Sequence, residues 1–261
     1  MGSSDAFAAA IAAADLRRFR QVEHHVSIRS TNEIAHRRLD DPAAAGLVIV
    51  ADEQTAGSGR RGRRWIAASR SGLLFTAILP EPVAASAAWG VTFWTGICVA
   101  DALQRWRIQP SLQWPNDILV GGRKLCGILC VSRILGDRAS VGCGVGVNVY
   151  RPRNRPELND IVPPPLFLDD VTVTSDAARE ELLVEILRQF ESRLDWLQAP
   201  EITAREWDTR ADLPARYRFA LDEGTQIEGI AEGLEAGGGL RVRTERGERI
   251  IELAEYVRVV R

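Results

Sequence analysis

The sequence predicts an α+β protein in which a mixed sheet with helices is followed by a small all-β unit. Strand-like and helix-like runs are interleaved up to about residue 200, which is typical of an α+β fold. From about residue 212 the chain changes to short alternating strands separated by glycine turns. About fifty residues of this kind suit a small barrel that is stabilised by packing against a larger domain. We therefore divide the chain into residues 1–210 and residues 211–261.

The overall composition is that of a globular protein. Hydrophobic residues make up 46% of the 261 residues and charged residues 26%, which is too apolar for a disordered chain. The formal net charge is −2, so no global positive field drives binding to nucleic acid. The cysteines form no C-x-x-C pair and no histidine stands at a ligand spacing, which favours buried, reduced thiols over a zinc site.

The N-terminal segment, residues 3–20, is rich in alanine and predicts a short helix. Its basic residues follow the apolar run and Asp5 precedes it, which is the wrong charge order for a signal peptide. No apolar run approaches the length of a membrane span. The sequence thus predicts a cytoplasmic protein with no membrane partner.

The elements of the first half follow from the hydrophobic pattern. Ser30 and Glu33 match a capping box, which predicts a short helix that starts there. Apolar residues at helical spacing between Trp89 and Leu103 predict a helix with a core stripe. In chain order we expect a strand at 20–28, a helix at 30–39, strands at 45–54 and 71–79, and a helix at 87–106.

A hairpin is predicted around Gly121-Gly122, a strong two-residue turn signal. This turn pairs Asp117 with Cys126, and strand alternation puts both on the face that carries Lys124. Asp117 and Lys124 then become diagonal neighbours, roughly 7–8 Å apart. The pair either shares a ligand or a metal ion, or it is a surface salt bridge of the common kind.

The strand expected at 141–149 has two unlike faces. Cys143 and three valines face a packed core, whereas three glycines and Asn148 face the other way. The glycines, at 142, 144 and 146, leave either a floor for a flat ligand or another backbone, or room for tight packing against a helix. Asn148 has a donor and an acceptor that match the N6/N7 edge of adenine. The other elements are expected at 117–120, 123–131 and 175–197, and in strands within 215–224, 227–236, 238–247 and 249–260.

The loop at residues 55–65, T-A-G-S-G-R-R-G-R-R-W, matches the G-x-G-x-x-G pattern of dinucleotide-binding folds. That fold needs a helix directly after the glycines and an acidic residue about 20 positions on. Here no helical pattern follows, and the acidic residue is Glu81, wedged between prolines.

The same loop suits an anion better than a dinucleotide. Bare glycine amides and clustered guanidinium groups bind carboxylates and phosphates. Because neighbouring arginines repel one another, we expect a loose loop that an anionic ligand closes as a lid. The alternative is a solvated basic loop or a patch for nucleic-acid phosphates. The loop arginines are Arg60, Arg61, Arg63 and Arg64.

Taken together, these motifs resemble those of biotin–protein ligases. Each motif alone is modest, whereas five in the family's order are highly specific. The resemblance implies a class II synthetase-like catalytic domain with a mixed sheet and helices at 1–210, and an SH3-like β-barrel at 211–261. The motifs are S-T-N at 30–32, G-S-G-R-R-G-R-R-W at 57–65, Q-W-P-N-D at 113–117, K-L-C-G-I-L at 124–129 and G-V-G-V-N-V at 144–149.

The resemblance also implies a two-step reaction. The carboxylate of biotin attacks the α-phosphate of MgATP and gives biotinyl-5′-AMP and pyrophosphate. A lysine of a biotin carboxyl carrier domain then displaces AMP. ATP, Mg²⁺ and biotin are therefore the expected ligands, and the carrier domain is the expected protein partner. Joining two anions needs local positive charge and exclusion of water, which the arginine loop and Lys124 can supply.

Site residues are carried over motif by motif. The expected catalytic residues are Lys124, which contacts the biotin carboxylate and the α-phosphate, Arg60 of the loop, and Asp117, which is also the expected Mg²⁺ ligand. The biotin pocket is expected to contain Ser30, Thr31, Asn32, Gln54, Ser58, Gly59, Arg60, Lys124 and the backbone of Gly127. Beside ATP and the adenylate we expect Arg60, Arg63, Trp65, Asn116, Lys124 and Asn148.

The chain departs from the family at three motif positions. Ser58 stands where the family has an arginine and Gln113 where it commonly has a lysine, so two charges are lost. Cys126 replaces an alanine and is expected to pack. About thirty residues precede S-T-N, too few for the DNA-binding domain of the family's repressors, so ligase activity without repression is expected.

Two rival functions stay open. A lipoate–protein ligase resembles the chain in the lysine strand, but it carries R-R-x-x-G-G and lacks W-P-N-D. A nucleic-acid-binding module would use the arginine loop, yet it would also need more basic residues elsewhere. We therefore expect no nucleic-acid partner, and a homodimer stays open.

Overall fold

The computed structural model describes residues 3–153, 158, 161–221, 225–252 and 256–259. Its α-helices are α1 (Ser3–Ala13), α2 (Thr31–Arg38), α3 (Gly90–Leu103), α4 (Ala178–Glu191) and α5 (Pro200–Asp208). Its strands are β1 (Gln21–Ile28), β2 (Leu47–Gln54), β3 (Gly72–Ile78), β4 (Val83–Ala84), β5 (Ser111–Gln113), β6 (Asp117–Val120), β7 (Arg123–Leu135), β8 (Arg138–Asn148), β9 (Ala215–Ala220), β10 (Gln226–Leu234), β11 (Leu240–Thr244), β12 (Gly247–Ile251) and β13 (Tyr256–Val259). Short 3-10 helices occupy Pro42–Ala44, Arg60–Gly62, Ala85–Ala87, Gln104–Trp106, Leu168–Asp170 and Leu194–Gln198.

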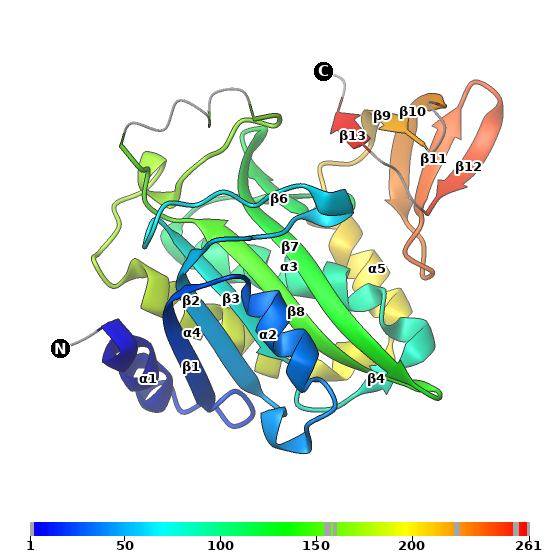
Figure 1. Cartoon of the computed structure of the whole chain (residues 1–261). Helices are drawn as coiled ribbons and strands as arrows, with labels where there is room; N and C mark the ends of the chain where they lie inside the picture. The colour runs from blue at the N-terminus through cyan, green and yellow to red at the C-terminus, as the bar shows by residue number, and fades with distance from the viewer. Residues whose placement is uncertain (1–2, 154–157, 159–160, 222–224, 253–255, 260–261) are drawn as a thin grey trace.

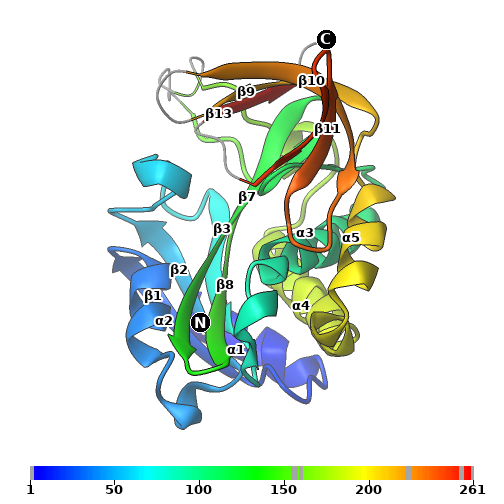
Figure 2. The ribbon, with the colours of Figure 1, turned by 90° about the vertical axis from the view of Figure 1, so that its right-hand side faces the viewer.

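An eight-stranded mixed sheet forms the centre of the larger part (Figure 1). Its strands run in the order β1-β2-β3-β8-β7-β6-β5, with β4 paired to β8. β1 and β2 are parallel, whereas the pairs along the rest of the sheet are antiparallel. Helix α2 lies on one face of the sheet, and α1, α3 and α4 lie on the other (Figure 2). The predicted mixed sheet with helices is confirmed.

The main hydrophobic core lies between the sheet and helices α3 and α4. Helix α3 is buried over almost its whole length, and β3 is buried from end to end. Cys143, Val145, Val147 and Val149 point into this core, as strand alternation predicts. The other face of the sheet, toward α2, carries a smaller hydrophobic cluster that includes Ala35, Ile49 and Ile78.

The last strands form a second sheet, antiparallel and five-stranded, in the order β12-β11-β10-β9-β13. It stands at one end of the larger part, next to α5 (Figures 1 and 2). Trp114 joins the two parts, because its indole N–H donates to the carbonyl of Gly238 at 3.3 Å. The single strand expected at 249–260 is two strands, β12 and β13, and residues 253–255 lie outside the described residues.

The helices match the expected ones in place but differ at their ends. The predicted N-terminal helix is confirmed as α1, and the helices expected at 87–106 and 175–197 each end earlier and continue as a 3-10 turn. Helix α5 was not predicted, although Pro200 at its first turn and Glu201 after it are recognised start signals. Within the described ranges, no helix combines the length and apolar character needed to cross a membrane.

The capping box predicted at Ser30 and Glu33 is wrong. Ser30 has the extended backbone of a cap, but its side chain makes no capping bond. Instead the amide of Thr31 donates to Oε1 of Gln54 at 2.7 Å, so a side chain from β2 satisfies the first turn. Glu33 pairs with arginines one turn away on either side.

The predicted hairpin is present, but its register shifts. Gly121 and Gly122 have φ of +57° and +77°, as a type I′ turn requires. A bulge then adds one residue to β7, so that Asp117 pairs with Gly127 and not with Cys126. The extra residue turns Cys126 into the core, where it is fully buried, and the prediction that it shares a face with Lys124 is wrong.

Candidate active site

A cavity of about 210 Å³ opens on the α2 side of the sheet, where β7 and β8 form its floor. The loop after β2, the turn before β6 and part of the segment after β8 close its sides. Every residue predicted from the motifs lines this cavity: Ser30, Thr31, Asn32, Gln54, Ser58, Gly59, Arg60, Arg63, Trp65, Asn116, Asp117, Lys124, Gly127 and Asn148. The fold thus brings together segments that are far apart in the chain.

One end of the cavity is a closed network of neutral polar groups. Thr31 donates from its amide and its hydroxyl to Gln54 Oε1, at 2.7 and 3.2 Å. Thr76 donates toward Thr31 Oγ1 and Asn32 Oδ1, at 2.8 and 2.7 Å. Asn32 in turn donates to the carbonyl of Leu129 at 2.8 Å. Because these groups hold one another in place, they form a rigid polar wall, and an uncharged polar ligand would bind at their remaining N–H groups and lone pairs.

The glycine floor is covered by side chains. A Cβ on Gly146 or Gly127 would lie 2.7 or 2.8 Å from the ring of Trp65, and a Cβ on Gly144 would collide with Asn32. Close packing is therefore the reason for these glycines in this structure. The expected packing against a helix holds at Gly144, which lies under Asn32 of α2, whereas Trp65 of the loop covers Gly127 and Gly146. The indole Nε1 of Trp65 is buried without a hydrogen-bond partner. Trp65 thus separates the neutral end from the charged end.

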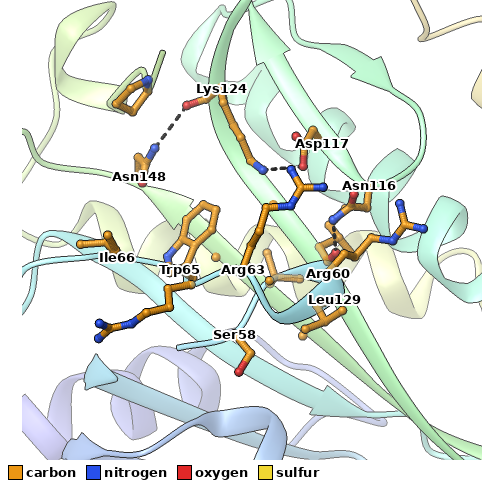
Figure 3. Close-up of a pocket in the computed structure, with 18 of the residues that line it drawn as sticks. Ser58, Arg60, Arg63, Trp65, Ile66, Asn116, Asp117, Lys124, Leu129 and Asn148 are labelled. Atoms are coloured by element: carbon orange, nitrogen blue, oxygen red, sulfur yellow. Dashed lines mark hydrogen bonds and ion pairs between the residues drawn. The ribbon is translucent and has the colours of Figure 1, made fainter. Parts of the chain in front are cut away.

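The charged end of the cavity is centred on Lys124 and Asp117. Lys124 Nζ lies 2.6 Å from Asp117 Oδ1, with side-chain exposures of only 22% and 16% (Figure 3). The two side chains point toward one another, as their predicted shared face implied. Lys124 Nζ also lies 5.6 Å from the centre of the Trp65 ring, within cation–π range. A half-buried ammonium next to a cavity can stabilise charge that develops on a phosphate.

The arginine loop folds back on itself beside this pair. The Gly59 amide donates to the Arg63 carbonyl at 2.7 Å, and the Trp65 amide donates to the Gly57 carbonyl at 2.9 Å. Arg60 begins a 3-10 turn and not an α-helix, which confirms that the loop is no dinucleotide fingerprint. Burial lowers the pKa of Arg60. The positive charges of Arg61 and Arg63 lower this pKa further, whereas the negative charge of Asp117 raises it. An incoming anion would relieve this unfavourable crowding of charge.

Two asparagines border the charged end. The side chain of Asn116 donates to the backbone carbonyl of Ile128 at 2.7 Å. The backbone carbonyl of Asn116 accepts from the Ile128 amide at 2.9 Å. Asn148 donates to the Lys124 carbonyl at 3.2 Å (Figure 3). One of the two N–H bonds of the Asn148 amide group is therefore engaged, and the second N–H remains for the predicted match to adenine.

Several lining residues were not predicted. Gln113 and Trp114 line the cavity next to Asn116, and the segment after β8 contributes Leu158, Ile161, Val162, Pro163 and Pro165. The proline run at 163–165 is a sequence signal for a stiff, extended segment, but only the fold shows that it lies over Lys124.

The donor set fits a magnesium ion that arrives with phosphates. Among the described residues, no three His, Cys, Asp or Glu side chains come close enough to hold a metal ion by themselves. Mg²⁺ usually takes one or two carboxylates and completes its shell with water and substrate phosphates. Asp117, with Asn116 beside it, can serve as that carboxylate. Cys126 is unsuited as a nucleophile, because burial raises the pKa of its thiol.

Known proteins are similar to this chain in sequence and in fold. The model of the biotin/lipoate A/B protein ligase family matches residues 25–148. A biotin–[acetyl-CoA-carboxylase] ligase of Mycobacterium tuberculosis is 30% identical over 233 residues, which cover 85% of this chain and 83% of the relative. The bifunctional ligase/repressor BirA of Bacillus subtilis is 30% identical over 253 residues, covering 89% and 72%. A biotin protein ligase from Aquifex aeolicus, solved with biotin and ATP, matches with a TM-score of 0.74 and 26% identity, covering 93% of this chain and 100% of that one.

Proposed function

The chain belongs to the biotin–protein ligase family, and we propose that it activates biotin with MgATP and transfers it to a lysine of a biotin carboxyl carrier domain. The observation that carries this proposal is the division of one cavity into two unlike ends. The neutral network around Thr31 and Gln54 suits the uncharged ring system of biotin. The Lys124–Asp117 end suits a carboxylate meeting a phosphate.

In the first step a carboxylate oxygen of biotin attacks the α-phosphorus of ATP, and the bond to the leaving pyrophosphate breaks. Both reactants are anions, so their approach needs fixed positive charge. Lys124 Nζ stands in the charged end, next to the Trp65 ring, and is held there by its ion pair with Asp117 and its contact with that ring. Arg60 supplies a second cation from the loop. We assign both as catalytic residues that neutralise charge on the carboxylate and the phosphate.

Asp117 would hold Mg²⁺ together with the phosphates, and the bound ion would shield the phosphate charge and stabilise the pyrophosphate as it leaves. Asp117 forms an ion pair with Lys124, so it has a role on either side of the reaction: it orients the ammonium, and it offers a carboxylate oxygen to the metal. Asn116 fixes this turn to β7 through its two bonds to Ile128.

In the second step the amine of the acceptor lysine attacks the acyl carbon of the mixed anhydride, and AMP leaves. The intermediate must be kept from water until the acceptor arrives. The loop at 57–65 is placed to cover it, because Ser58, Gly59 and Arg60 line the cavity from outside. We assign Ser30, Thr31, Asn32, Gln54 and Gly127 to biotin, and Arg63, Trp65, Asn116 and Asn148 to the nucleotide.

We propose further that residues 211–261 form an SH3-like barrel that is distinct from a catalytic domain at 1–210. Its short antiparallel strands, which pair in a sheet of their own, support this division. The cytoplasmic location, the absence of a nucleic-acid partner and a homodimer stay predictions from the sequence.

The test is biotin-dependent exchange of labelled pyrophosphate into ATP. We expect exchange with biotin and Mg²⁺, none without Mg²⁺, and none with lipoate in place of biotin. Exchange with lipoate and not with biotin would show that lipoate is the substrate. Exchange with neither would refute the proposed activity.

A further inference from the structure

The segment at residues 161–166, called the strap here, runs beside the backbone of Lys124. The Lys124 amide donates to the Pro164 carbonyl at 2.8 Å, and the Leu166 amide donates to the Lys124 carbonyl at 2.8 Å. Lys124 and Pro165 form a parallel bridge. Both backbone polar groups of Lys124 are therefore held by the strap.

Arg123 fastens the strap from the neighbouring position on β7. Its Nη2 donates to the Pro165 carbonyl at 2.7 Å and to Asp170 Oδ2 at 3.2 Å. Asp170 also accepts from Arg151 at 2.5 and 2.6 Å and from the Phe167 amide at 3.0 Å. One guanidinium thus joins the C-terminal part of the strap, at Pro165, to the carboxylate of Asp170 beyond it.

The charges of this cluster agree with its geometry. Burial alone would raise the pKa of Asp170, but the hydrogen bonds from Arg151 and Phe167, with the charges of Arg151 and Arg123, outweigh it and lower the pKa overall. The hydrogen bond to Asp170 likewise raises the pKa of Arg151. The cluster is therefore ionised at neutral pH and acts as a charge-assisted clasp.

We propose that Arg123 is a positioning residue for the adenylation step. Arg123 itself stays outside the described lining of the cavity, so it acts through the strap. The strap fixes the backbone of Lys124 and covers the cavity on the side where Asn148 lies. The inference rests on the proposed function, because it takes the nucleotide to bind where Asn148 and Lys124 border the cavity.

The position of the clasp predicts a selective defect. The network around Thr31 and Gln54 has hydrogen bonds of its own and does not involve the strap. Loosening the strap should therefore weaken productive binding of MgATP more than binding of biotin, because biotin keeps this network even where its carboxylate loses contact with Lys124. For Arg123→Gln we expect KM for MgATP to rise roughly tenfold, as loss of a partly exposed charge-assisted hydrogen bond does.

A matched control exists on the same strand. Arg133 also donates to a carbonyl, that of His36 at 3.3 Å, and pairs with a carboxylate, that of Asp40 at 2.6 Å. Its side-chain exposure is 38%, against 40% for Arg123. Arg133→Gln removes an equivalent set of bonds far from the strap, so KM for MgATP should stay within twofold of the wild-type value.

The experiment measures pyrophosphate exchange and biotin affinity for Arg123→Gln, Arg123→Lys, Asp170→Asn, the Arg123→Gln/Asp170→Asn double variant and Arg133→Gln. We expect Arg123→Lys to restore part of the MgATP affinity, and the double variant to lose less than the product of the single losses. An unchanged KM for MgATP in Arg123→Gln would overturn the proposal, as would an equal loss of biotin affinity or an equal defect in Arg133→Gln.

A second readout separates this inference from the proposed function. Hydrogen exchange at the amides of Lys124 and Leu166 should be faster in Arg123→Gln and unchanged in Arg133→Gln. This result depends only on the clasp. If the wild-type protein showed no biotin-dependent exchange, the proposed function would fall while the hydrogen-exchange result still decided whether Arg123 holds the strap.

Discussion

Replacing Gly146 by alanine should separate the role of Trp65 from the stability of the fold. A Cβ at this position would lie 2.7 Å from Cε2 and 3.0 Å from Cζ2 of the Trp65 ring. Ordinary contact begins at 3.4 Å, so the ring edge must move by at least about 0.7 Å. Trp65 belongs to a surface loop, so we expect the loop to yield and the buried strand to stay in place.

The size of the effect follows from what this displacement disturbs. The cation–π contact of Lys124 with Trp65, at 5.6 Å, is worth about 0.5–1 kcal/mol at a partly exposed site. Misplacing groups at a reaction centre by about 1 Å can cost on the order of a hundredfold in rate. We therefore expect kcat/KM for pyrophosphate exchange to fall about 10- to 100-fold, or about 1.4–2.7 kcal/mol of transition-state stabilisation.

The assay is biotin-dependent pyrophosphate exchange, with thermal unfolding measured on the same samples. Gly142→Ala is the matched control, because Gly142 lies on the same strand and face but its Cβ would meet Thr76, Val131 and Ala35 at 3.1 to 3.4 Å, which small shifts can relieve. We expect Gly142→Ala to keep at least half of the wild-type rate. Full activity of Gly146→Ala, or an equal loss in both variants, would refute the argument that the packing of Trp65 on the glycine floor matters for catalysis.

Three further outcomes are expected. Lys124→Ala should slow adenylation by roughly a hundredfold or more, as loss of a charge-stabilising donor does; a folded variant with near-normal exchange would remove this lysine from the mechanism. Biotin with MgATP should protect the loop at 57–65 from trypsin, because the ligand closes it; equal cleavage with and without ligand would argue against a lid. Trp114→Phe removes the hydrogen bond to Gly238 and should raise KM for MgATP several-fold by loosening the turn that holds Asn116. Trp94→Phe, which removes a similar buried bond to the Arg193 carbonyl at 2.8 Å, should not, and a shift of equal size in both would show only general destabilisation.

Features that depend on neighbours in the chain were predictable. The turn at Gly121-Gly122 could be read because both residues need a positive φ, which glycine adopts without strain. The buried face of β8 followed from strand alternation. The site residues that were named from the five motifs all lie in the lining of the cavity.

Features that depend on packing were missed. The bulge in β7 reversed the side on which Cys126 lies, because one inserted residue changes the face of every residue beyond it. The start of α2 at Thr31 is capped by the side chain of Gln54 from β2, and no local sequence pattern indicates this contact. The prolines at 163–165 indicate that the strap is stiff, but nothing in the sequence indicates that it lies beside Lys124.

By itself, the sequence determined the kinds of groups in the site, the local elements that carry them and the family to which the chain belongs. Tertiary structure alone decided how these groups meet: Thr31 bonds to Gln54 across 23 positions, and Asn32 bonds to Leu129 across 97. The physical reason is that turns and strand faces are set by the torsions and period of adjacent residues. Contacts between distant segments depend instead on register and packing across the whole sheet.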